Sequence, residues 1–140
     1  MKNTIFALMF ISIGAKAQSN FTVTVDSFFN FKFEKSLSAS VALNTKNFIE
    51  LDGSVGKTII TVNEKNLTIL MQFDSTLHTL HILGQSNGNN DAYIYEYKEV
   101  DKMIRGQMSF VDSSTGERYV LAESQDENPN YQKAWIAKIR

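Results

Sequence analysis

Apolar and polar residues alternate with a period of two through most of this 140-residue chain. The one-sided apolar rows cover residues 21–25, 29–33, 37–43, 60–62, 67–73, 93–97 and 104–110, and a short run follows at 118–122. Successive side chains of a strand point to opposite faces, so each row predicts a strand with one apolar face. The pattern therefore indicates an all-β fold.

The breaks between these rows are rich in turn-forming residues. They lie at residues 52–56, 63–66, 84–91 and 112–116, and the chain has a single proline, Pro129. About nine or ten strands joined by short turns describe an antiparallel meander, which at this size must close or stack. We predict an up-and-down barrel, lipocalin-like in shape, with a two-sheet sandwich as the alternative.

The C-terminal segment 131–140 fits two structures. Tyr131, Trp135 and Ile139 are four residues apart, as on one face of a helix. Trp135, Ala137 and Ile139 also alternate with polar or outward residues, as in a strand. We favour the strand, because a barrel or sandwich gains more from covering an exposed sheet edge than from an added helix.

The N-terminus has the pattern of a secretory signal peptide. Lys2 supplies a positive charge, residues 5–13 form an apolar run, and Ala15-Lys16-Ala17 is an A-x-A cleavage pattern before Gln18. A membrane span needs about 20 apolar residues, so this run predicts no integral membrane span. We expect residues 1–17 to be removed, and residues 18–140 to form a single all-β domain that is periplasmic or secreted.

Charge and cysteine content narrow the function classes. Without residues 1–17 the chain has 12 basic and 15 acidic side chains, a net charge of −3. This balance gives no electrostatic reason to expect a nucleic-acid partner. The chain has no cysteine, which excludes disulfides, thiolate metal sites and a cysteine nucleophile.

Residues 53–58 (GSVGKT) resemble part of a phosphate-binding loop. The complete motif needs a glycine at position 51, which is Leu51, and a helix after the loop. Residues 59–62 instead have the composition of a strand. We interpret residues 52–56 as a hairpin turn between 48–51 and 57–62, and predict no nucleotide cofactor.

His78 and His81 are the histidines of the chain, spaced H-x-x-H. Residues 77–83 read as a strand, so the two rings should lie on opposite faces rather than share a metal ion. His78 has the same parity as Leu80 and Ile82 and is expected inside, hydrogen-bonded, whereas His81 should face solvent. No metal site is predicted.

Acidic residues give no catalytic signature. Glu96 and Glu99, and Asp112 and Glu117, lie at turns or on exposed faces of the predicted strands. The loop 87–91 (NGNND) has oxygen ligands but lacks the spacing and the final glutamate of a calcium loop. We predict no catalytic residues.

Aromatic residues carry the functional hypothesis. The phenylalanines at 28–33 are expected to be core, whereas Tyr93, Tyr95 and Tyr97 form a stripe whose hydroxyls need partners, in a core, a cavity or a surface strip. The first hypothesis is a non-enzymatic barrel that binds a small apolar or amphipathic ligand through His78, the three tyrosines and Trp135. The alternatives are an interaction module that meets a protein partner through a sheet edge or an aromatic strip, and then a hydrolase.

Overall fold

The computed structural model describes residues 20–86 and 91–140. Their elements are β1 (Asn20–Glu34), α2 (Ala39–Thr45), β2 (Ile49–Glu50), β3 (Ser54–Asn63), β4 (Thr68–Phe73), β5 (Thr76–Gln85), β6 (Ala92–Glu99), β7 (Lys102–Asp112), β8 (Arg118–Gln125) and β9 (Tyr131–Lys138). The predicted signal peptide at 1–17, and positions 87–90 of the predicted Asn-rich loop, lie outside the described residues.

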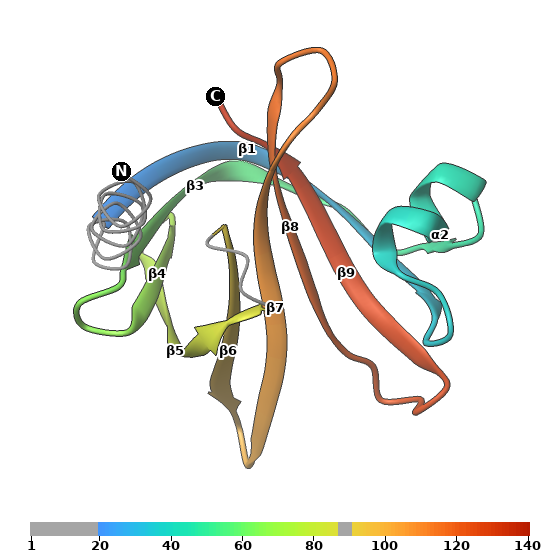
Figure 1. The fold of residues 1–140 in the computed structure, drawn as a ribbon. Helices are drawn as coiled ribbons and strands as arrows, with labels where there is room; N and C mark the ends of the chain where they lie inside the picture. The colour runs from blue at the N-terminus through green and yellow to red at the C-terminus, as the bar shows by residue number, and fades with distance from the viewer. Residues whose placement is uncertain (1–19, 87–90) are drawn as a thin grey trace, which may run out of the picture.

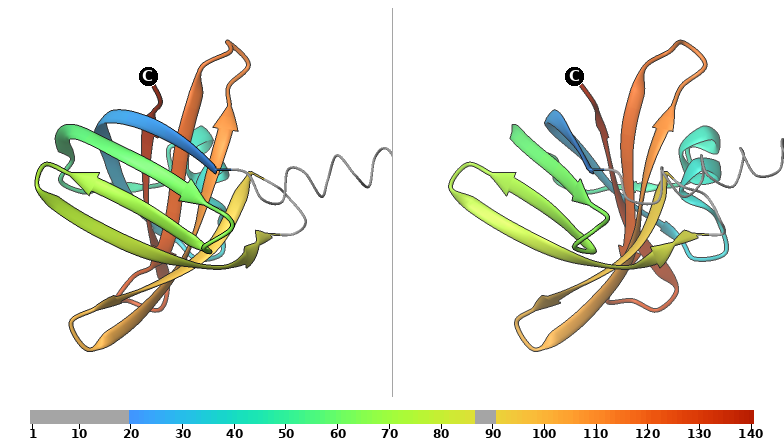
Figure 2. Two further views of the ribbon diagram at one scale, coloured as in Figure 1. Left: turned by 90° about the vertical axis from the view of Figure 1, so that its left-hand side faces the viewer. Right: turned by 60° about the vertical axis from the view of Figure 1, so that its left-hand side comes forward.

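Eight of the described strands close into an antiparallel up-and-down barrel. The hydrogen-bonded order runs from β1 through β3 to β9 in sequence order, and β9 pairs with β1 to complete the ring. Figure 1 and the two views of Figure 2 show the strands curving around a common interior. The predicted barrel is thus confirmed, and so is the closing strand at the C-terminus.

Strand β1 changes the face that it buries halfway along its length. Its register with β3 shifts between Val25 and Ser27. Before the shift, Val23 and Val25 pack into the barrel, and after it Phe28 does so. Phe31 and Phe33 therefore lie on the outer surface of the barrel, where they are 0% and 1% exposed.

The predicted strand over 37–43 is wrong, because Ala39–Thr45 form helix α2. Ser38 caps the helix, and its side-chain oxygen accepts a hydrogen bond from the Val41 N–H at 3.2 Å. Ala39 and Ala42, three residues apart, are buried against Phe31 and Phe33. Figure 1 shows α2 outside the barrel, beside β9 and the C-terminal half of β1.

The predicted hairpin turn at 52–56 is also wrong. Both β2 and β3 run antiparallel to β1, with Glu50 opposite Phe31 and Ser54 opposite Phe28. Between them the Leu51 N–H donates to the Asn30 carbonyl at 2.8 Å, so the segment continues along β1 without reversing. The chain reverses its direction earlier, in the segment between β1 and β2 that contains α2. Residues 59–62 lie in β3 as predicted, so no helix follows Lys57 and a phosphate-binding loop is excluded.

Inward-facing side chains fill one end of the barrel. The buried members of this core include Val25, Ile60, Val62, Ile69, Ile82, Phe110 and Val120. At this end the Phe110 ring packs edge-on against Phe21 and Tyr93, with centroid distances of 5.0 and 6.3 Å. These aromatic contacts close one end, and the opposite end is where the interior is hollow.

Candidate functional site

The hollow part of the barrel is a cavity of about 810 Å³ that we call the main cavity. Its lining includes Asn30 on β1 and residues from β4 to β9: Met71 on β4, Leu80 on β5, Tyr95 on β6, Met108 on β7, Ser124 on β8 and Trp135 on β9. These positions continue the inward-facing rows of the closed end. The cavity therefore exists because the same rows that fill one end leave space at the other.

Four of the five predicted ligand-binding residues line the main cavity: His78, Tyr95, Tyr97 and Trp135. His78 has the inward parity predicted for it, together with Leu80. Its ring is exposed in the cavity and has no hydrogen-bond partner among the described residues, contrary to the expected buried, bonded histidine. His81 is exposed on β5, and no group of three or more metal-binding side chains occurs within 20–86 and 91–140.

Tyr93, the fifth predicted residue, belongs to the closed end instead. It is 2% exposed, and its hydroxyl donates a hydrogen bond to the Glu64 carboxylate at 2.6 Å. Burial and the neighbouring Glu64 raise the pKa of Tyr93, which therefore stays protonated. The tyrosine stripe is thus divided: Tyr93 is core, whereas Tyr95 and Tyr97 face the cavity.

Tyr95 occupies its position because its cross-strand partner is Gly106. A Cβ atom on Gly106 would lie only 2.5 Å from Cζ of the Tyr95 ring, so a larger residue would displace that ring. The Tyr97 ring lies 6.2 Å away, tilted by 30°. The glycine therefore allows one side of the cavity to be aromatic.

Charged residues among the cavity lining are two acids and two lysines: Asp52, Lys98, Glu99 and Lys133. Lys98 and Glu99 are the last residues before the β6–β7 turn, and Lys133 forms an ion pair with Asp126 at 3.6 Å. Sequence reasoning missed these residues, and it missed Met71 and Met108 as cavity residues. The methionines do lie in predicted apolar rows, but a row identifies the inward face and not the level of the cavity.

A smaller chamber of about 250 Å³ adjoins the main cavity and shares Asn30, Met71, His78 and Trp135 with it. The Phe28 ring meets the Trp135 indole edge-on, with a centroid distance of 4.8 Å. Phe73 on β4 also lines this side chamber. The two spaces together form an aromatic and thioether-lined site that also has charged side chains in its lining.

No protein-family model matches the chain, and no curated protein is similar to it in sequence. The geometry of the barrel is therefore the guide to its function. Among the residues that the structure describes, no helix has the length and the hydropathy to cross a membrane.

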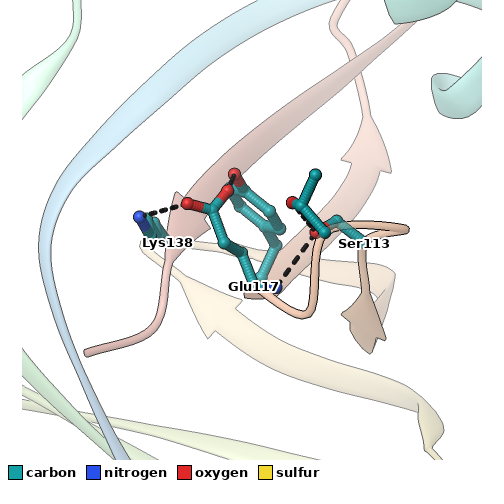
Figure 3. Close-up of polar contacts among 5 residues, drawn as sticks. Ser113, Glu117 and Lys138 are labelled. Carbon is teal, nitrogen blue, oxygen red and sulfur yellow. Dashed lines mark hydrogen bonds and ion pairs between the residues drawn. The ribbon is translucent and has the colours of Figure 1, made fainter.

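Two carboxylates at the β7–β8 turn are held in surface ion pairs, and Figure 3 shows that of Glu117 with Lys138. Glu117 accepts hydrogen bonds from Lys138 Nζ at 2.7 Å and from the Tyr119 hydroxyl at 2.8 Å. Lys138 lowers the pKa of Glu117 chiefly through this hydrogen bond. Asp112 pairs with Arg118 at 3.0 Å. Glu117 is thus stabilised in its charged form, which is not how a general acid is prepared.

The buried tyrosines predict loss of stability in alkali. Burial raises the pKa of both Tyr93 and Tyr95 above the ordinary tyrosine value, and in the unfolded chain both ionise near pH 10. The folded protein keeps these protons to higher pH than the unfolded chain does. The contribution of the two tyrosines to the free energy of unfolding is therefore complete below about pH 10 and decreases above it. The slope reaches about 1.4 kcal/mol per pH unit for each tyrosine.

Urea unfolding between about pH 8 and pH 11 measures this slope. The Tyr95→Phe variant removes one ionising group and should show a shallower decline than the parent protein. Identical pH profiles for the two proteins would contradict the assignment of the effect to Tyr95.

Proposed function

We propose that this chain is an exported, non-enzymatic barrel that binds a small apolar or amphipathic ligand in the main cavity. The observation that carries the proposal is the hollow end of the barrel, about 810 Å³ in volume. Small-molecule sites typically have volumes of about 300–1,000 Å³ and mostly apolar linings with a few polar groups. His78, Tyr95, Tyr97 and Trp135 would be the orienting side chains.

The distribution of charge supports an amphipathic ligand over a purely apolar one. Leu80, Met71 and Met108 give the cavity an apolar lining, whereas charged groups are brought to it by Asp52, Lys98, Glu99 and Lys133. An apolar ligand body would bury its surface against the first set, at about 25 cal/mol per Å². A polar or ionised end would remain close to the second set and to water.

Export is supported by the order of charged, apolar and small residues at positions 1–17. It also agrees with a stable fold that needs no disulfide, as in many periplasmic proteins. Expression of the full chain in a bacterial host tests this part: we expect a periplasmic or secreted product that begins at Gln18. A product that keeps Met1 and stays in the cytoplasm would refute export without affecting the ligand proposal.

Native mass spectrometry of the purified barrel tests ligand binding. We expect an additional mass that is lost under denaturing conditions, and saturable binding of the amphipathic probe 8-anilinonaphthalene-1-sulfonate. A barrel that carries no additional mass and does not bind the probe would overturn the proposal.

An interaction module that adds a partner's strand to the sheet has less support. The pairing of β1 with β9 joins the two ends of the eight-strand sheet. Among the described strands, β2 is left at the end of the hydrogen-bonded order, and it is two residues long. An edge of that length offers a partner very few backbone hydrogen bonds.

A further inference from the structure

Thr58 lies at the side chamber and has a buried hydroxyl that the fold leaves unsatisfied. The residue lines the chamber and is 1% exposed. Its Oγ1 has no hydrogen-bond partner among the described residues. Burying a hydroxyl without a partner costs about 1–3 kcal/mol, so such groups are rare and call for an explanation.

The remaining lining of the chamber favours a planar ring. Phe28 and Trp135 meet at a right angle, and Phe73 and Met71 add a further aromatic ring and a thioether. Aromatic rings favour edge-to-face contacts with other aromatic rings, and thioether sulfur packs well against ring edges. The volume of about 250 Å³ is sufficient for a single six-membered ring with small substituents.

Gly56 helps to shape this chamber. A Cβ atom on Gly56 would collide with Cε2 and Cζ of the Phe73 ring, so only glycine allows Phe73 to lie against β3 at this point. Three residues of the run that resembles a phosphate loop thus contribute to the chamber: Ser54 and Thr58 line it, and Gly56 makes room for the Phe73 ring.

The chamber also lacks the acidic and lysine side chains that line the main cavity. None of its described lining residues is an acid, a lysine or an arginine, whereas Asp52, Lys98, Glu99 and Lys133 line the main cavity. A ligand that occupies both spaces would therefore place an uncharged end in the chamber and any ionised end in the main cavity.

We propose that the side chamber binds the ring-bearing end of the ligand, and that one neutral polar group on this ring, a hydroxyl or a carbonyl, hydrogen-bonds to Thr58 Oγ1. The ligand class is thus an amphiphile with a single six-membered ring that carries one uncharged oxygen. This inference rests on the ligand-binding function proposed above and specifies the chemistry of the ligand.

The test uses p-cresol and toluene, which differ by one hydroxyl. Titrations are followed by the indole N–H resonance of Trp135, the single tryptophan of the chain. We expect p-cresol to bind more tightly than toluene, and the Thr58→Val variant to bind p-cresol about fivefold more weakly while its affinity for toluene is unchanged. Because Val has the shape of Thr and removes an unsatisfied hydroxyl, this variant should fold normally.

The Thr76→Val variant is the matched control, because Thr76 is exposed on β5 and lines neither the main cavity nor the side chamber. Its affinity for p-cresol should equal that of the parent protein. Equal losses for p-cresol and toluene in Thr58→Val, or no loss for either compound, would overturn the role of Thr58. Binding of 8-anilinonaphthalene-1-sulfonate without binding of either ring compound would overturn the chamber assignment alone, and failure of all three probes would overturn the carrier function as well.

Discussion

Replacing Phe31 with alanine is expected to lower the free energy of unfolding by about 3–5 kcal/mol, although this side chain lies outside the barrel. Phe31 is 0% exposed, and its ring lies 5.7 Å from the rings of Phe29 and Phe48 and 5.8 Å from that of Phe33, centroid to centroid. Helix α2 covers the cluster, so the substitution removes a large apolar group from between two packed elements. The resulting cavity is the physical reason for the loss.

Urea unfolding measures this loss, and Val55→Ala is its control. Val55 lies on β3 and is 87% exposed, so its truncation should change the free energy of unfolding by less than about 0.5 kcal/mol. A cost below about 1 kcal/mol for Phe31→Ala would show that α2 and the outer cluster are dispensable.

The position of Phe31 also marks the limit of what the sequence predicts. The rows 21–25 and 29–33 have the same parity, and a regular strand would place both on one face. The irregular register between Val25 and Ser27 separates them onto opposite faces of the barrel. That irregularity depends on how β1 pairs with β3, a contact across more than 25 residues of sequence that no local pattern encodes.

Helix α2 was missed for a related reason. Residues 37–43 alternate small and apolar side chains, which fits a strand, yet Ala39 and Ala42 are equally compatible with one helical face. Ser38 is a suitable N-cap, but several serines occur nearby, and each of them could cap a helix equally well. The helix is selected over the strand because it buries the neighbouring aromatic surface of β1. That surface is formed by another segment, so the sequence of 37–43 alone does not reveal it.

The tyrosine stripe shows how far the site itself was predictable. Alternation placed Tyr93, Tyr95 and Tyr97 on one face, and all three do face inward. Strand parity specifies a face but not a level along the barrel axis. Tyr93 meets Glu64 at the closed end, while Tyr95 and Tyr97 line the cavity; the difference arises from the stagger of β6 against its neighbours.

Filling the main cavity should abolish ligand binding without unfolding the barrel. Ser124 faces the cavity from β8, and the Ser124→Phe variant adds a ring to the space that a ligand would occupy. We expect its affinity for 8-anilinonaphthalene-1-sulfonate to fall at least about tenfold, equivalent to about 1.4 kcal/mol of binding free energy. Because the added ring enters an existing hollow, the cost in stability should remain below that of Phe31→Ala.

Ser27→Phe is the matched control for this variant, since Ser27 is exposed on β1 and lines none of the cavities described above. The same ring is added there to the outer surface, so probe affinity should equal that of the parent protein. Fluorescence titration with all three proteins separates the two sites of substitution. Equal affinities for Ser124→Phe and the parent would place the probe outside the barrel and remove the main cavity as the binding site, whereas a loss confined to Ser124→Phe would assign binding to the interior.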